Sequence, residues 1–145
     1  MRKLAAVVLA GILFTVPVAS AIAATTVTGN LTLKLTVTIV STIATTTAIQ
    51  CTFSVNVSGA SSTGQSDNIQ ELDTVPATRS GSTAVCQLAI PYQWILYGTS
   101  DTVGLSSSIT ATNASGNGRY SSASFETIAV PKNGATTSYV LTGRI

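Results

Sequence analysis

The 145-residue sequence contains no histidine and few charged residues, and both absences limit what the protein can do. Without an imidazole, the chain lacks the side chain that most often serves as general base, proton shuttle and metal ligand. Only 8% of the residues are charged. Beyond residue 23, five cationic residues balance five acidic ones. A neutral chain with scattered charges has no electrostatic footprint for nucleic acid, so we expect no nucleic-acid partner.

Motifs for catalysis and cofactor binding are also missing. The sequence has no Gly-x-Ser-x-Gly elbow, no phosphate-binding glycine loop and no His-based metal motif. Asp67, Glu71 and Asp73 lack the dense Asp/Asn/Gly spacing of a calcium loop, so we interpret them as a solvated loop. We therefore expect no enzyme activity, no cofactor, no metal and no catalytic residues.

The first 23 residues have the order of a secretory signal peptide. A basic stretch at residues 1–3 precedes an apolar run from Leu4 to Val16 and a series of small residues. The apolar run is too short to span a bilayer, which needs about 20 residues. We expect cleavage after Ala21 or Ala23, no membrane span afterwards, and a destination in the periplasm, at the cell surface or outside the cell. Residues 24–145 then form a single domain.

Two cysteines, Cys51 and Cys86, remain in the exported chain. Thiols in such chains are normally paired, and these two are neither in a Cys-x-x-Cys pair nor supported by any histidine. We predict one disulfide. In the loop-entropy model, closing this loop stabilises the fold by about 4 kcal/mol.

Alternation of apolar and polar residues runs through most of the chain beyond the leader. A period of two is typical of strands with one buried and one solvated face. Seven segments show this pattern or a weaker form of it: 27–40, 51–57, 69–75, 86–94, 103–111, 125–130 and 138–145. Ser/Gly-rich stretches separate several of them, and Asn133-Gly134 predicts a tight turn between the last two.

No segment shows a helical period, so the sequence predicts an all-β fold. Six or seven short strands with one disulfide are typical of an antiparallel, immunoglobulin-like β-sandwich. Cys86 shares its parity with Tyr92 and Trp94, which places both rings in the core beside the disulfide. Tyr97 has the opposite parity and is our candidate ligand contact, because exposed aromatic rings can stack on sugars. Pro91 predicts an edge strand or a bulge.

The segment from Val27 to Val40 is unusually long. Fourteen residues span roughly 46 Å at about 3.3 Å per residue, whereas ordinary strands hold five or six residues. Three alternatives are open: the strand bends and serves both sheets, its N-terminal part projects from the body, or it is an ordinary first strand in a self-complete sandwich. A projecting strand could fill the groove of a neighbouring copy by β-strand addition. The face it would present consists of Val27, Gly29, Leu31, Leu33, Leu35, Val37 and Ile39.

This layout resembles that of the chaperone–usher pilins. The shared features are the signal peptide, the alternating N-terminal segment, a Thr-rich body with one disulfide, and a C-terminal strand ending on apolar Ile145. The opening Thr-Val-Thr-Gly-Asn-Leu-Thr-Leu-Lys-Leu is also similar to the start of spore-coat-U-type fibre subunits. The resemblance implies identical or related subunits and a periplasmic chaperone as partners.

Two functions remain open at this point. The first is an exported, non-catalytic structural or adhesive surface protein, with fimbrial-like assembly of a fibre by β-strand addition. The second is a self-contained, secreted β-sandwich that binds carbohydrate or a protein. The first strand distinguishes them, because only the fibre subunit needs it to reach another copy.

Overall fold

The computed structural model describes residues 23–145, except 62–63, 99 and 123–124. The predicted signal peptide lies outside the described residues, apart from Ala23. The described chain contains nine strands and no helix, which confirms the all-β fold class. It therefore has no helix that is long and apolar enough to cross a membrane. The strands are β1 (Thr25–Thr38), β2 (Ala48–Ala60), β3 (Ser66–Pro76), β4 (Thr78–Ser80), β5 (Thr83–Leu96), β6 (Thr102–Thr112), β7 (Gly118–Ser122), β8 (Glu126–Ala129) and β9 (Ala135–Arg144).

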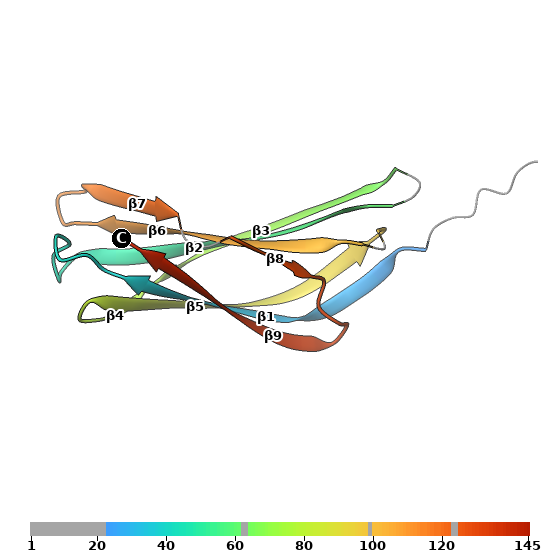
Figure 1. Cartoon of the computed structure of the whole chain (residues 1–145), viewed down its shortest axis with the longest axis horizontal. Coiled ribbons are helices and arrows are strands. Elements are labelled where there is room, and N and C mark those ends of the chain that lie inside the picture. Colours follow the sequence, from blue (N-terminus) through green and yellow to red (C-terminus); the bar gives the residue numbers. More distant parts are fainter. Residues whose placement is uncertain (1–22, 62–63, 99, 123–124) are drawn as a thin grey trace, which may run out of the picture.

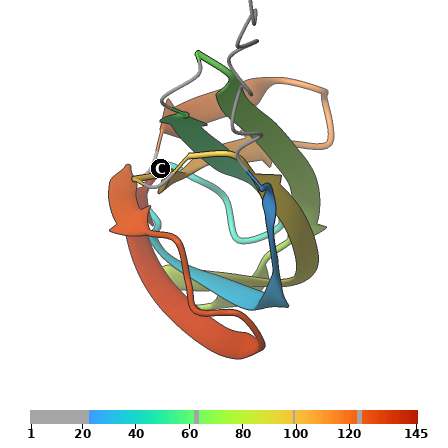
Figure 2. The same ribbon diagram turned by 90° about the vertical axis from the view of Figure 1, so that its right-hand side faces the viewer.

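The strands form two sheets that face each other as a sandwich (Figures 1 and 2). Sheet A has the order β4-β5-β1-β9, and sheet B has the order β3-β2-β6-β7, with β8 also pairing with β6. All neighbours are antiparallel except β1 and β9, which run parallel. The predicted antiparallel sandwich is therefore correct, with one parallel pair inside it.

The predicted alternation decides which face of each strand is buried. In β1 the odd-numbered side chains point into the core, and in β5 the even-numbered ones do so. Phe53 and Trp94 are the largest fully buried side chains, one from each sheet. The disulfide between Cys51 and Cys86 is present and joins β2 to β5, so it links the two sheets through the core.

The strand β1 neither bends into both sheets nor projects from the molecule. It is the first strand of its own sandwich, which was the third alternative for the long segment. It pairs with β5 along its whole length, from Thr25 opposite Leu96 to Thr38 opposite Thr83. The partner strand β5 also holds 14 residues, which is why the long segment is fully accommodated. Strand length is set by the partner as well as by the pattern, and the partner is far away in sequence.

Pro91 lies inside β5, although proline has no backbone N–H to donate to a neighbouring strand. The short strand β4 pairs only with residues 83–85, so β5 is an edge strand at Pro91, as predicted. Opposite Pro91 and Tyr92 lie Asn30 and Gly29. A Cβ atom at position 29 would collide with the Tyr92 hydroxyl and with the backbone carbonyl of Ala135. Glycine at this position allows the buried Tyr92 ring to lie against β1.

Two details of the C-terminal half differ from the sequence prediction. The expected loops contain two additional strands, the three-residue β4 and the edge strand β7. The Asn133-Gly134 turn exists, with the Ala135 amide donating to the Lys132 carbonyl and Gly134 at a φ of 76°. It does not close a hairpin, because β8 belongs to sheet B and β9 to sheet A. Turn residues predict a reversal of the chain but not the sheet that the next strand joins.

Candidate functional site

The first candidate site is the position of β1 between β5 and β9. Within the part of the chain that the structure describes, β9 pairs with β1 alone in sheet A, and β5 meets β9 through β1. The register with β9 runs from Gly29 opposite Ala135 to Thr38 opposite Arg144. Without β1, sheet A would be split along its length into β4-β5 and β9. The first strand therefore closes a gap between two strand edges.

The seven residues of the predicted donor face line this gap. Leu31, Leu33, Leu35 and Val37 have no exposed surface, Val27 and Ile39 are buried, and Gly29 is half-buried. Leu33 lies between Leu88 of β5 and Tyr139 of β9. These side chains fill the core of their own chain here. The structure places them in an inserted strand, and their role as a donor to another copy stays a prediction.

One connection, residues 39–47, carries the chain from β1 in sheet A to β2 in sheet B. The amides of Ile39 and Val40 donate to the carbonyls of Ser82 and Ile145, at 2.8 and 2.7 Å. The Arg79 guanidinium donates to the carbonyl of Ala44 at 2.7 Å. The connection is thus anchored by these polar contacts and by the buried side chains of Ile39 and Ile43. The strand β1 pairs with β5 along its whole length and with β9 from Gly29 to Thr38.

The predicted ligand contact Tyr97 is half-buried, and its backbone amide is bound within the molecule. This amide and that of Gly98 donate to Oδ2 of Asp67, at 2.8 and 3.0 Å. Tyr92 and Trp94 are buried as predicted, with ring centroids 4.1 Å apart in a stacked arrangement. Tyr97 therefore follows the end of β5 directly, and Asp67 holds its backbone in place.

The interpretation of Asp67 and Glu71 as solvated loop residues is wrong. Asp67 is only 5% exposed and anchors the end of β5. Glu71 is half-buried, and its Oε1 accepts a hydrogen bond from the indole nitrogen of Trp94 at 3.0 Å. Both carboxylates satisfy donors that come from strand β5 or its end, which are remote in sequence. In the described chain no group of three or more potential metal-ligating side chains gathers.

Asp101 packs its carboxyl against Asp67. Burial raises the pKa of the Asp101 carboxyl, and the charge of Asp67 and their shared hydrogen bond raise it further, while the Gly98 amide lowers it. A Cβ atom at Gly59 or Gly98 would collide with this carboxyl, so the two glycines make room for it. One carboxyl oxygen of Asp101 is buried without a hydrogen-bond partner.

The Asp101→Asn variant should be more stable than the parent chain at neutral pH. Because the folded-state pKa is raised, the proton on Asp101 stabilises the fold at pH values below the ordinary carboxyl range. That stabilisation disappears as the pH rises through the folded-state pKa, and the amide does not ionise. Urea unfolding at pH 3.5 and pH 7 measures the difference. Glu126→Gln, at an exposed position, serves as the control. An equal effect of Asp101→Asn at both pH values would contradict this account.

Sequence reasoning missed a trough on the outer face of sheet B. Its floor carries the small hydroxyl side chains of Thr52, Ser54, Ser106 and Ser108, and its volume is about 440 Å³. Leu72, Tyr120 and Phe125 border it and are 65%, 72% and 70% exposed. The signal available in the sequence was the presence of two rings, Tyr120 and Phe125, in otherwise polar surroundings.

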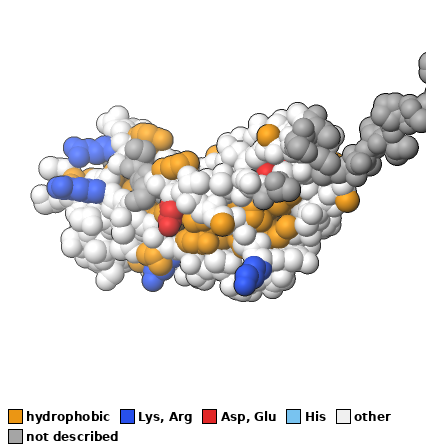
Figure 3. Space-filling view, turned by 45° about the vertical axis from the view of Figure 1, so that its right-hand side comes forward, with side chains coloured by type: hydrophobic (Ala, Val, Ile, Leu, Met, Phe, Trp, Pro, Cys, Tyr) orange, Lys and Arg blue, Asp and Glu red, His pale blue; other side chains and the backbone are white. Residues whose placement is uncertain are grey.

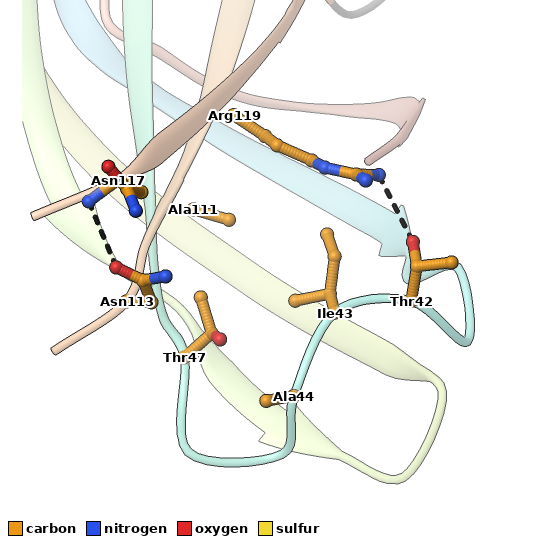
Figure 4. A pocket seen from close by; sticks show the side chains of 8 residues that line it. All are labelled: Thr42, Ile43, Ala44, Thr47, Ala111, Asn113, Asn117 and Arg119. Carbon is orange, nitrogen blue, oxygen red and sulfur yellow. Dashed lines mark hydrogen bonds between the residues drawn. The ribbon is translucent and has the colours of Figure 1, made fainter. Parts of the chain in front are cut away.

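Two further hollows lie at the end of the sandwich that holds the connection 39–47. One is lined by this connection and by the hairpin between β6 and β7, and Figure 4 shows the side chains around it. The other lies between β7 and the end of β9 and shares Arg119 with the first. Sequence reasoning treated this part of the chain as loops and assigned no function to it.

The chain matches no protein-family model, no curated protein and no solved structure. The function must therefore be argued from the residues of this chain.

Proposed function

We propose that this chain is an exported, non-catalytic structural subunit that assembles into a surface fibre by β-strand addition, with β1 as the donated strand. One observation carries the proposal: among the described strands, β1 alone joins β5 to β9 in sheet A. The gap between β5 and β9 is as long as a strand, and the chain's own β1 fills it. The first strand of another copy would fit the same gap.

The contacts of β1 do not depend on the copy that supplies it. Its backbone ladders with β5 and β9 and its buried side chains would form equally with the first strand of a neighbour. The balance between the two states then depends on the connection 39–47 and on the local concentration of other copies. Within the described residues, this connection is the one covalent link between β1 and the rest of the sandwich, so it must change its course. The ladders of β1 with β5 and β9 break within one copy and form again with another.

Repeated donation in one direction produces an open chain of subunits. Each copy gives a strand and receives one, which is a head-to-tail contact that does not close by symmetry. The disulfide indicates an oxidising, exported environment, and it ties β2 to β5 within each subunit. The body that receives the strand is thereby held together while β1 is exchanged. The resemblance to pilins supports the same mode of assembly.

A pair of cysteines across the seam tests the proposal. Lys34 and Gln87 are exposed and lie opposite each other in the register of β1 and β5. In the Lys34→Cys/Gln87→Cys variant, oxidation should link different chains if β1 is donated. A non-reducing denaturing gel of the exported material should then show a covalent ladder that collapses on reduction.

The matched control is a pair within sheet B. Ser54 and Ser106 face each other across β2 and β6, which are not exchanged in the proposal. The Ser54→Cys/Ser106→Cys variant should give single chains on the same gel, even when the native material is polymeric. Single chains from both variants would overturn strand donation.

That outcome would leave the self-contained binding module as the function. The observation that favours this second candidate is the trough on sheet B, where exposed rings stand beside a floor of hydroxyl groups. Aromatic faces stack on the apolar faces of sugars, and hydroxyl groups exchange hydrogen bonds with them. On this reading Tyr120 and Phe125 replace Tyr97 as the ligand contacts.

A further inference from the structure

We propose that the end of the sandwich around residues 39–47 binds a carboxylate-bearing sugar, in the pocket between this connection and the β6–β7 hairpin. We call it the hairpin pocket. Its volume is about 150 Å³, which suits a single sugar ring. Because residues 42–47 line the pocket, it exists in the form described here, in which the connection 39–47 is closed and β1 lies in its own subunit. The proposal does not rest on strand donation.

Positive charge is concentrated at this end of the molecule. Arg79, Arg119 and Arg144 come from β4, β7 and β9, and all three border the connection or the hollows beside it. The described acidic residues lie elsewhere, on β3, on β8 and before β6, and no ion pair forms with these arginines. Figure 3 shows Lys and Arg side chains at the left-hand end of its face and others along its lower edge. Arg79 donates to the carbonyls of Gly81, Ala44 and Ile43, so Arg119 and Arg144 are the guanidinium groups that face the hollows.

The lining of the hairpin pocket combines three kinds of group. Arg119 supplies a guanidinium, and its Nη1 donates to the Thr42 hydroxyl at 3.1 Å (Figure 4). Asn113, Asn117 and Thr47 supply amide and hydroxyl groups. The buried side chains of Ile43 and Ala111 supply an apolar surface. A guanidinium pairs with a carboxylate through two parallel hydrogen bonds, while amides and hydroxyls suit the hydroxyl groups of a sugar.

Part of the pocket is held in place before any ligand arrives. Oδ1 of Asn113 accepts hydrogen bonds from the amides of Ser115 and Asn117, at 3.1 and 2.9 Å. Because its oxygen is engaged in the turn, the Asn113 side chain presents its NH₂ group to the pocket (Figure 4). On the opposite side, Arg79 holds the carbonyls of Ile43 and Ala44. Binding a ligand to preformed donors costs less conformational entropy than ordering mobile ones.

A chain of acidic sugars has room to continue beyond this pocket. The neighbouring groove, of about 460 Å³, shares Arg119 and adds Arg144 and Tyr120. The next carboxylate along the chain can meet Arg144. The charged groove predicts that affinity rises with the number of acidic sugar units and falls with added salt.

Calorimetric titration of the monomeric protein with galacturonic acid and its trimer tests the proposal. Galactose is the neutral control, and acetate tests for a carboxylate without a sugar. We expect binding in the order trimer, galacturonic acid, then acetate, with no binding of galactose. Arg119→Gln should weaken both acidic sugars by about tenfold or more, because a charge-assisted bidentate contact is lost.

Two further variants distinguish the contact with Arg119 from a general effect of positive charge on binding. Arg144→Gln should weaken the binding of the trimer and leave the binding of the monosaccharide unchanged, since Arg144 lines the neighbouring groove and not the hairpin pocket. Lys34→Gln removes the same charge from the outer face of β1 and should change neither affinity. Equal losses in Arg119→Gln and Lys34→Gln would overturn the site. Binding of galactose as strong as that of galacturonic acid, or acetate as strong as the acid sugar, would overturn the ligand class.

Discussion

Replacing Cys51 and Cys86 together by alanine should lower the free energy of unfolding by about 4 kcal/mol. The disulfide closes a segment with a sequence separation of 35 residues and joins strands of opposite sheets. Its loss gives the unfolded chain back the conformational entropy that the closed loop removes. Both sulfur atoms are fully buried, so the substitution also removes packed atoms from the core.

Equilibrium urea unfolding of the double variant measures this effect. The midpoint should fall strongly, and the same shift should appear in the parent chain once it is reduced. The Ser54→Ala/Ser106→Ala variant changes an outward-facing pair on β2 and β6 and is a matched control, which should stay close to the parent in stability. A double cysteine variant with unchanged stability would show that the two sheets are held without the covalent link.

Replacing Leu33 by alanine should lower the free energy of unfolding by about 2–5 kcal/mol. Leu33 has no exposed surface and lies at the middle of β1, between residues of β5 and β9. Removing its three outer carbons leaves a cavity at the place where β1 closes sheet A. Lys34→Ala, one residue along and exposed, should change stability by less than about 0.5 kcal/mol.

The same variant also reports on assembly. If β1 is donated between copies, the lost packing appears at a contact between subunits, so Leu33→Ala fibres should dissociate at a lower denaturant concentration than Lys34→Ala fibres. If β1 stays in its own chain, the loss appears as unfolding of monomers. Equal stability of the two variants would contradict the buried position of Leu33.

Strand identity was readable from the sequence because it depends on a local pattern. The alternation in residues 27–39 predicted which side chains would be buried, and the parity of Cys86, Tyr92 and Trp94 correctly placed all three in the core. The two rings do not lie beside the disulfide as expected, because Cys86 and Trp94 are eight residues apart on β5, about 26 Å at about 3.3 Å per residue. Side chains of a strand point to opposite faces with a period of two, so their inward face follows without knowledge of the partner.

The candidate sites were much less predictable, because each one combines segments that are distant in sequence. The hairpin pocket joins residues 42–47 to residues 111–119, and the trough on sheet B needs β3 beside β2 and β6. From the sequence alone, Asp67 and Glu71 were interpreted as solvated. In the structure Asp67 binds the backbone at the end of β5, and Glu71 binds the Trp94 indole. Tyr97 had the right parity for exposure but lies at a strand end that Asp67 braces.

By itself, the sequence determined an all-β chain with one disulfide, a core of alternating apolar residues and a surface rich in hydroxyl groups. Only the tertiary structure decided that β1 lies between β5 and β9, that β8 and β9 belong to different sheets, and that three arginines meet at one end. The physical reason is that burial parity is set by neighbours along the chain, whereas strand partners are selected by packing between segments far apart in sequence.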